Sequence, residues 1–284
     1  MNRWKAAAIH LSISIVIAMP IGALLYFVWF RSPYFTAAGA SKLILLLMGV
    51  DVCIGPLLTL LVVNRHKPAK LLRRDLTVIG VLQAIAFGYG LHVIINSRPV
   101  FIVAEVDRLV MVSAYQLSDA DLAKGRRPEF RKRSFVGPVL VGALPPKGEG
   151  SGDFALQVLA TGKDIDQLPQ YYVPYDQVID DVMKKRAKPL TSLKNATAAQ
   201  QAYLAGLQAA YPTLTLKVLP LQRGEHSYSA IISSASKRPI SVLDIDPWEW
   251  GKVKPGEPSN PGGATQPIAA ANGQLRVGRR LAPD

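Results

Sequence analysis

The 284-residue sequence predicts a membrane protein with three N-terminal transmembrane α-helices, followed by a small exported α+β domain with a largely antiparallel sheet. Three apolar stretches lie within the first 96 residues, at Ala6–Phe30, Leu43–Val63 and Leu76–Ile95. Each is long enough to cross the hydrocarbon core of a bilayer, which takes about 20 residues of helix. Beyond them, helix-like and strand-like segments follow one another in mixed order, which is typical of an α+β fold.

Basic residues near the ends of these stretches predict the orientation, because Lys and Arg are retained on the cytoplasmic side of a membrane. Seven of them lie on one side, in the N-terminus and in the connection Asn64–Asp75, whereas the other side holds only Arg31, Lys42 and Arg98. The N-terminus is therefore predicted to be cytoplasmic, and an odd number of spans exports everything after Ile95. The first stretch is too long for a cleaved signal peptide, so we interpret it as a retained signal anchor.

Composition divides the chain into three parts. Residues 1–96 are the predicted transmembrane region, residues 97–250 the exported domain and residues 251–284 a tail. The tail contains six Gly and five Pro with almost no bulky apolar residues, a composition that predicts disorder. The net charge of +13 divides into +7 for residues 1–96 and +6 for the remainder, an excess too diffuse to indicate a nucleic-acid partner.

The reactive side chains argue against catalysis in the exported domain. The only cysteine, Cys53, lies in the second apolar stretch, which excludes a disulfide, a thiol nucleophile or a cysteine zinc site beyond the spans. His226 is the only histidine of the exported domain, and it lies in the predicted turn Gly224–Ser227. The sequence contains no phosphate-binding glycine loop and no nucleophile motif. We therefore expect no enzyme activity, no cofactor and no metal.

Strand and helix patterns follow along the exported domain. Val100–Val106 and Leu109–Ala114 are rich in β-branched residues and predict a hairpin directly after the third apolar stretch. A short helix is predicted after Ser118, because acidic residues follow it. Helical spacing predicts helices within residues 175–186 and 197–211, and composition predicts strands at Gly137–Leu144, Leu214–Leu219, Tyr228–Ser233 and Ile240–Ile245.

Asp51 is an ionisable residue in the middle of the second apolar stretch. Such a group costs on the order of 3 kcal/mol at that depth, so it usually faces other helices and has a partner. Counting from the outer ends of the stretches predicts Tyr89 as its best hydrogen-bond donor, with His92 and Gln83 less well placed. Gly49, Gly55 and Pro56 permit close helix approach or a kink. Asp51 could hold the spans together, in which case Asp51→Asn should be nearly silent; docking of another protein's transmembrane segment and ion conduction are the alternatives.

A basic loop is predicted between Gly125 and Arg133. Its cations are Arg126, Arg127, Arg131, Lys132 and Arg133, and they are opposed only by Glu129. Three interpretations are open: a solvated surface, contact with lipid head groups, or contact with DNA. No aromatic residues are interleaved with these cations in the way that single-stranded nucleic acid favours, so nucleic acid is not an expected partner.

Several short motifs occur in a fixed order along the chain. They are Met1-Asn2-Arg3-Trp4-Lys5-Ala6, Gly49-Val50-Asp51-Val52, Gly55-Pro56-Leu57-Leu58-Thr59-Leu60, Arg98-Pro99-Val100, Val106-Asp107-Arg108 and Asp246-Pro247-Trp248. In order and spacing they resemble the TfpX/TfpZ family of type IV pilin accessory proteins, from residue 1 to about residue 250. The C-terminal tail and the basic loop depart from the family pattern, so the resemblance implies no role for either.

This resemblance implies a multi-pass inner-membrane protein of a Gram-negative bacterium, with its C-terminal domain in the periplasm. It implies a non-enzymatic chaperone that assists assembly of one major pilin into type IV pili. The alternative is a membrane-anchored extracytoplasmic sensor or signalling adaptor, which is weakened because the cytoplasmic parts are too small to carry an output domain. Pilin specificity is predicted to reside in residues 97–250, because a varied folded surface discriminates better than an apolar helix.

Overall fold

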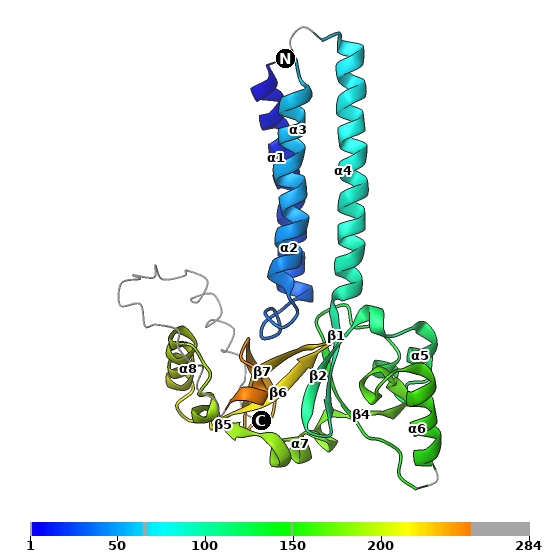
Figure 1. Cartoon of the computed structure of the whole chain (residues 1–284), viewed down its shortest axis with the longest axis vertical. Helices are drawn as coiled ribbons and strands as arrows, with labels where there is room; N and C mark the ends of the chain where they lie inside the picture. Colours follow the sequence, from blue (N-terminus) through cyan, green and yellow to red (C-terminus); the bar gives the residue numbers. More distant parts are fainter. Residues whose placement is uncertain (1, 65–66, 149, 251–284) are drawn as a thin grey trace.

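The computed structural model describes residues 2–64, 67–148 and 150–250. Three long helices stand side by side, and a mixed α/β domain lies at one end of them (Figure 1). The N-terminus and the connection between the second and third helices lie together at the opposite end. The predicted disordered tail, residues 251–284, falls outside the described residues.

Each predicted apolar stretch forms a helix that is long and apolar enough to cross a membrane, at Arg3–Trp29, Ala40–Val62 and Ala69–Ser97. The first consists of α1 (Arg3–Leu24) and a wider π-helical turn (Leu25–Trp29). The second consists of α2 (Ala40–Gly49), a π-helical turn (Val50–Ile54) and α3 (Gly55–Val62). The third is α4 (Ala69–Ser97), which is followed almost immediately by the first strand.

The connector between the first two helices, residues 30–39, packs into the α/β domain. Phe30, Ala37 and Ala38 are completely buried in one apolar cluster with residues of the sheet. Gly39 ends the connector in the left-handed region, at φ 62°, where a side chain would meet the guanidinium group of Arg223. The helices and the sheet therefore share a core.

The sheet has eight strands, in the order β4-β3-β1-β2-β6-β7-β8, with β5 paired to β6. Their bounds are β1 Pro99–Glu105, β2 Arg108–Ser113, β3 Val139–Ala143, β4 Tyr172–Pro174, β5 Lys188–Pro189, β6 Leu216–Arg223, β7 His226–Ser233 and β8 Pro239–Leu243. The predicted hairpin is confirmed as β1 and β2, which pair antiparallel.

The sheet is mixed, which corrects the prediction of a largely antiparallel one. Its central pairings, β1 with β3 and β2 with β6, are parallel. Both join strands that are distant in sequence, and the local hairpin patterns on which the prediction rested carry no information about such pairings. Alternate residues of β1 enter two apolar clusters: Ile102 and Ala104 contribute to the one that includes the connector, and Phe101 and Val103 to the other.

Four helices belong to the domain: α5 (Asp119–Ala123), α6 (Gly150–Thr161), α7 (Ile179–Arg186) and α8 (Ala198–Ala210). The predicted helix after Ser118 is confirmed, and Ser118 caps it by accepting a hydrogen bond from the backbone N–H of Asp121. The predicted helix within 175–186 is shorter than expected, because its first turn is a 3-10 turn. Such turns lie at Ala114–Gln116, Pro128–Phe130, Ile165–Gln167, Pro169–Tyr171, Tyr175–Gln177, Leu190–Ser192 and Pro247–Glu249.

Candidate functional site

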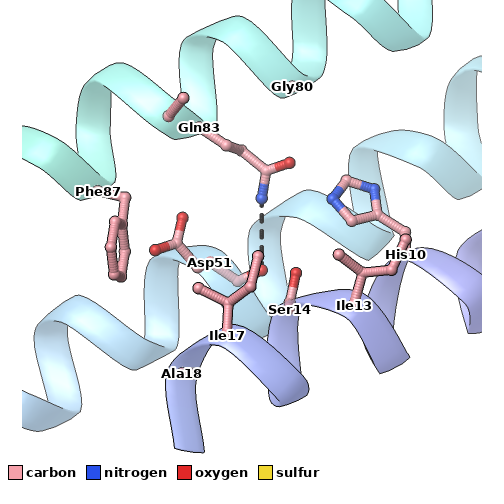
Figure 2. A pocket seen from close by; sticks show the side chains of 10 residues that line it. His10, Ile13, Ser14, Ile17, Ala18, Asp51, Gly80, Gln83 and Phe87 are labelled. Carbon is pink, nitrogen blue, oxygen red and sulfur yellow. Dashed lines mark hydrogen bonds between the residues drawn. The ribbon is translucent and has the colours of Figure 1, made fainter. Parts of the chain in front are cut away.

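A cleft lies between α1 and α4, which both pack against the second long apolar helix (Figure 2). Its volume is about 290 Å³. The α1 side is lined by His10, Ile13, Ser14, Ile17 and Ala18, and the α4 side by Gly80, Gln83, Ala84 and Phe87. Asp51 comes from the helix between them. The cleft is therefore apolar with a small number of polar groups, which is the usual composition of a binding site.

Asp51 lies in the π-helical turn between α2 and α3. Pro56 follows that turn, and proline has no backbone N–H to donate and crowds the carbonyl group four residues earlier. The helix accommodates this by widening, and such π turns are frequent at functional sites. Pro56 therefore accounts for the local distortion that carries Asp51.

The two glycines of this region differ in their surroundings. A Cβ atom at Gly55 would overlap the side-chain amide of Gln83, whereas a Cβ atom at Gly49 would meet nothing within 4 Å. Gly55 thus permits the close approach of α4, which the sequence predicted for both residues. Gly49 plays no such part within this chain.

The carboxylate of Asp51 has no hydrogen-bond partner among the described residues, although the residue is only 8% exposed. The amide of Gln83 donates to the backbone carbonyl of Asp51 instead, with 3.4 Å between Nε2 and O. On α1, Nδ1 of His10 lies 2.6 Å from Oγ1 of Thr59. A buried acceptor without a donor is costly, so Asp51 is the group in this cleft that a ligand would satisfy.

The predicted hydrogen bond from Tyr89 to Asp51 is absent from the structure, and Tyr89 is 71% exposed. The second apolar helix begins at Ala40, three residues before the run that set the count, but α4 also ends two residues beyond Ile95, at Ser97. The level of Asp51 along α4 therefore changes by only about 1.5 Å, and the rotation of α4 accounts for the difference. The residues of α4 that face it are spaced like one side of a helix, from Gly80 to Phe87, and Tyr89 is off that side.

Two polar residues of the cleft, His10 and Ser14, were not among the residues predicted from sequence. They are four residues apart in the first apolar stretch, so they lie on the same side of α1. Polar residues at that spacing inside a membrane span were an available signal, and it points to the side that meets Asp51.

The Asp246-Pro247-Trp248 motif fixes the end of the folded domain to the sheet. The carboxylate of Asp246 accepts a hydrogen bond from the backbone N–H of Trp248. The indole N–H of Trp248 donates to Oγ of Ser227, and the guanidinium groups of Arg108 and Arg186 lie over its ring, at 5.8 and 5.5 Å from its centre. These contacts indicate a structural role for the motif.

The cations of the basic loop divide into two groups. Arg131 donates from Nε to the carbonyl of Gly125, and Arg133 donates to the carbonyls of Ala114 and Leu117 and pairs with Asp119. These two hold the loop in shape. Arg127 forms an ion pair with Glu129 at 3.6 Å. Arg126 and Lys132 are exposed and have no hydrogen bond or ion pair with any described residue.

Two buried carboxyl groups lie close together in the α/β domain, at Glu105 and Asp166. Burial, reinforced by the neighbouring Asp166, raises the pKa of Glu105 to about 8. Burial also raises the pKa of Asp166 to about 6. Nε of Arg108 lies 4.0 Å from a Glu105 oxygen, and at that distance it offsets only part of the cost of burying the Glu105 charge. Within the described ranges no set of three His, Cys, Asp or Glu side chains is grouped so as to hold a metal ion.

The sequence model of the fimbrial assembly protein FimB family matches residues 1–39. Fimbrial assembly proteins of Dichelobacter nodosus from serogroups I and E1 are 32% and 31% identical over 248 residues, which is 86% of this chain and 96% of each relative. A third, from serogroups C1 and C2, is 38% identical over 109 residues, which is 38% of this chain and 83% of that relative. No solved structure matches this chain.

The two long alignments cover 86% of this chain, so they are long enough to include both apolar helices and residues of the sheet domain. They support a role in fimbrial or pilus assembly rather than in catalysis. The identity over nearly the whole length of the relatives places the chain in a family. This protein belongs to the fimbrial assembly protein FimB family.

Proposed function

We propose that this protein is a non-enzymatic accessory protein, or chaperone, that assists assembly of a type IV major pilin into pili at the bacterial inner membrane. The observation that carries the proposal is the relation to fimbrial assembly proteins over 96% of their length. The resemblance of its motifs to the TfpX/TfpZ accessory proteins agrees with it. A pilin is an apolar helix with a periplasmic head, so a helper needs both membrane helices and an exported domain.

We place the N-terminus in the cytoplasm and the α/β domain in the periplasm. The seven basic residues of one side support this orientation, and the N-terminus and the α3–α4 connection lie at the end of the helices away from the domain (Figure 1). Alkaline phosphatase fused after Trp250 should be active, and a fusion within Asn64–Asp75 should be inactive. The reverse pattern would overturn the orientation.

We further propose that the Asp51 cleft is where the spans meet the membrane helix of the pilin. The unpartnered carboxylate supports this, because a hydrogen-bond donor on that helix would relieve the cost of burying it. The apolar walls of the cleft suit a neighbouring helix, and Gln83 adds an amide for a second polar contact. Pilin specificity remains assigned to residues 97–250.

Deletion of the gene tests the function directly. The accessory role predicts that surface pili are lost while pilin continues to be made and remains in the membrane, measured by immunoblots of sheared and cell-bound fractions. Expression of the intact gene in trans is the control. The sensor alternative predicts a fall in pilin transcript instead, so quantifying the transcript separates the two.

A chimera tests the assignment of specificity. When residues 97–250 are exchanged with those of a relative that serves another pilin, recognition should follow the exchanged domain. Cross-linking in native membranes identifies the bound pilin by mass spectrometry. If recognition follows residues 1–96, the spans read the pilin and the domain does not.

A further inference from the structure

Phe135 and Val136 form an exposed apolar pair on the segment that leaves the basic loop, at the end of the domain nearest the spans. They are 60% and 65% exposed. We propose that this pair is a membrane-binding tip that enters the interface of the bilayer, and that the neighbouring free cations bind its anionic head groups. This lipid contact does not depend on which pilin the protein serves.

Contacts with the ends of two spans fix the depth of the tip. The ring of Phe135 packs edge-on against Trp29, the last residue of the first span, with 5.7 Å between ring centroids. Arg98, the first residue after α4, donates from Nε to the carbonyl of Ser134 at 3.5 Å. Its guanidinium group lies 5.6 Å from the centre of the Trp29 ring. Phe135 is therefore held at the level where a membrane helix ends, which is the level of the interface.

The side chains suit that level. Aromatic residues are enriched at the boundary between head groups and acyl chains, and Trp29 and Phe135 together form an aromatic pair there. Exposure of the Phe135 and Val136 side chains to water is unfavourable, and contact with lipid would remove that cost. The bilayer is also the only apolar phase that the spans bring within reach, which identifies lipid as the occupant of this surface.

Charge complements the apolar contact. Arg126 and Lys132 are exposed without partners among the described residues, whereas Arg131 and Arg133 are bound to carbonyls of the fold. Two free cations in the loop that leads into the inserted apolar pair predict attraction to anionic lipid. The cations of the loop therefore have two roles. Arg126 and Lys132 contact lipid, and Arg131 and Arg133 hold the loop in its conformation.

The chain offers a matched control. Leu159 of α6 is 82% exposed and equally apolar, but α6 lies away from the spans (Figure 1). Lys184 and Lys185 of α7 are exposed cations, and α7 lies at the end of the domain away from the long helices in the same view. If exposure alone decided lipid contact, Leu159, Lys184 and Lys185 would behave like Phe135, Arg126 and Lys132. If the tip inserts into the membrane, they would not.

The full chain, with Cys53→Ser, is to be reconstituted into phosphatidylcholine vesicles with and without phosphatidylglycerol, and a nitroxide attached at Phe135→Cys. Collision of the nitroxide with oxygen, which dissolves in lipid, is compared with collision with a water-soluble nickel complex. We expect the oxygen-to-nickel ratio at position 135 to exceed the ratio at a Leu159→Cys label severalfold. Val136→Cys repeats the measurement in case one substitution disturbs the fold.

The cations are tested in the same assay. Arg126→Gln with Lys132→Gln should lower the ratio at position 135 in vesicles containing phosphatidylglycerol, and Lys184→Gln with Lys185→Gln should leave it unchanged. Equal, water-like ratios at 135, 136 and 159 would overturn the tip. A high ratio that is the same with and without phosphatidylglycerol, and the same in the Arg126 and Lys132 variant, would overturn the electrostatic half of the proposal.

Discussion

Arg223 of β6 donates a hydrogen bond from Nη1 to the backbone carbonyl of Ala37, at 3.2 Å, across 186 positions of sequence. The bond joins the sheet to the connector between the first two spans. Burial lowers the pKa of Arg223, and its guanidinium group lies where a side chain on Gly39 would point. The connector is therefore part of the domain, although it lies far from it in sequence.

The connector predicts a steric effect at Ala38, which is completely buried. Ala38→Leu should lower the free energy of unfolding by about 1–3 kcal/mol, because the site has no space for a larger side chain. Thermal unfolding of the full chain in detergent measures this. Ala155→Leu on the exposed surface of α6 is the control and should have little effect. Equal stability of the two variants would show that the connector does not pack on the sheet.

Gly142 of β3 predicts a second packing effect. A Cβ atom there would lie 2.9 Å from Cβ of Val178, so Gly142→Ala should destabilise the domain by about 1–3 kcal/mol. Gly206, inside α8, has nothing within 4 Å, so Gly206→Ala should stabilise it by about 0.5–1 kcal/mol. Opposite shifts of the unfolding midpoint are expected, and shifts in the same direction would contradict the packing of β3 against the Val178 turn.

Glu105 predicts a dependence of stability on pH. Its folded pKa of about 8 lies above its ordinary value of 4.5, so between these values the folded protein binds more protons than the unfolded chain. Stability should therefore fall as pH rises from 4.5 to about 8, with a limiting slope of about 1.4 kcal/mol per pH unit. Glu105→Gln should flatten this slope in denaturant titrations at several pH values. Asp166 would still contribute a fall in stability, over the narrower range from pH 3.8 to about pH 6.

Asp51 predicts a separation of stability from function. Asp51→Leu removes an unpartnered buried carboxylate and should leave the thermal stability of the purified protein equal or higher. It should nevertheless reduce surface piliation, because the acceptor for the pilin helix is lost. Asp51→Asn keeps an acceptor and should have a smaller effect on piliation.

Cys53→Ala, on the exposed side of the same helix, is the matched control for Asp51→Leu and should be silent in both measurements. If Asp51→Leu instead lowers protein stability and piliation together, Asp51 holds the spans to one another. The cleft would then not be the contact with pilin.

Local patterns predicted the apolar helices, the β1–β2 hairpin and the helix capped by Ser118, because each depends on residues that are adjacent in sequence. They missed α6. This helix buries no side chain completely, and Leu156 and Leu159 are exposed, so its apolar residues do not follow the spacing of a helix with one buried side. They also missed the parallel pairings, which join distant segments. For the site, Asp51 was evident from its chemistry, and the spacing of His10 and Ser14 was an available signal. Which residue of α4 faces Asp51, Gln83 rather than Tyr89, depends on the rotation of that helix, which sequence does not supply.

The α/β domain is tied to the apolar helices twice, by the connector and by the junction at which β1 follows α4 within two residues. A domain on one flexible tether would rotate freely, whereas in the proposed topology this one keeps a fixed height and orientation above the bilayer. A partner confined to the same membrane then meets it by lateral diffusion in two dimensions. Much of the rotational freedom that association normally removes is already absent before they touch, so even a weak, brief contact can be selective.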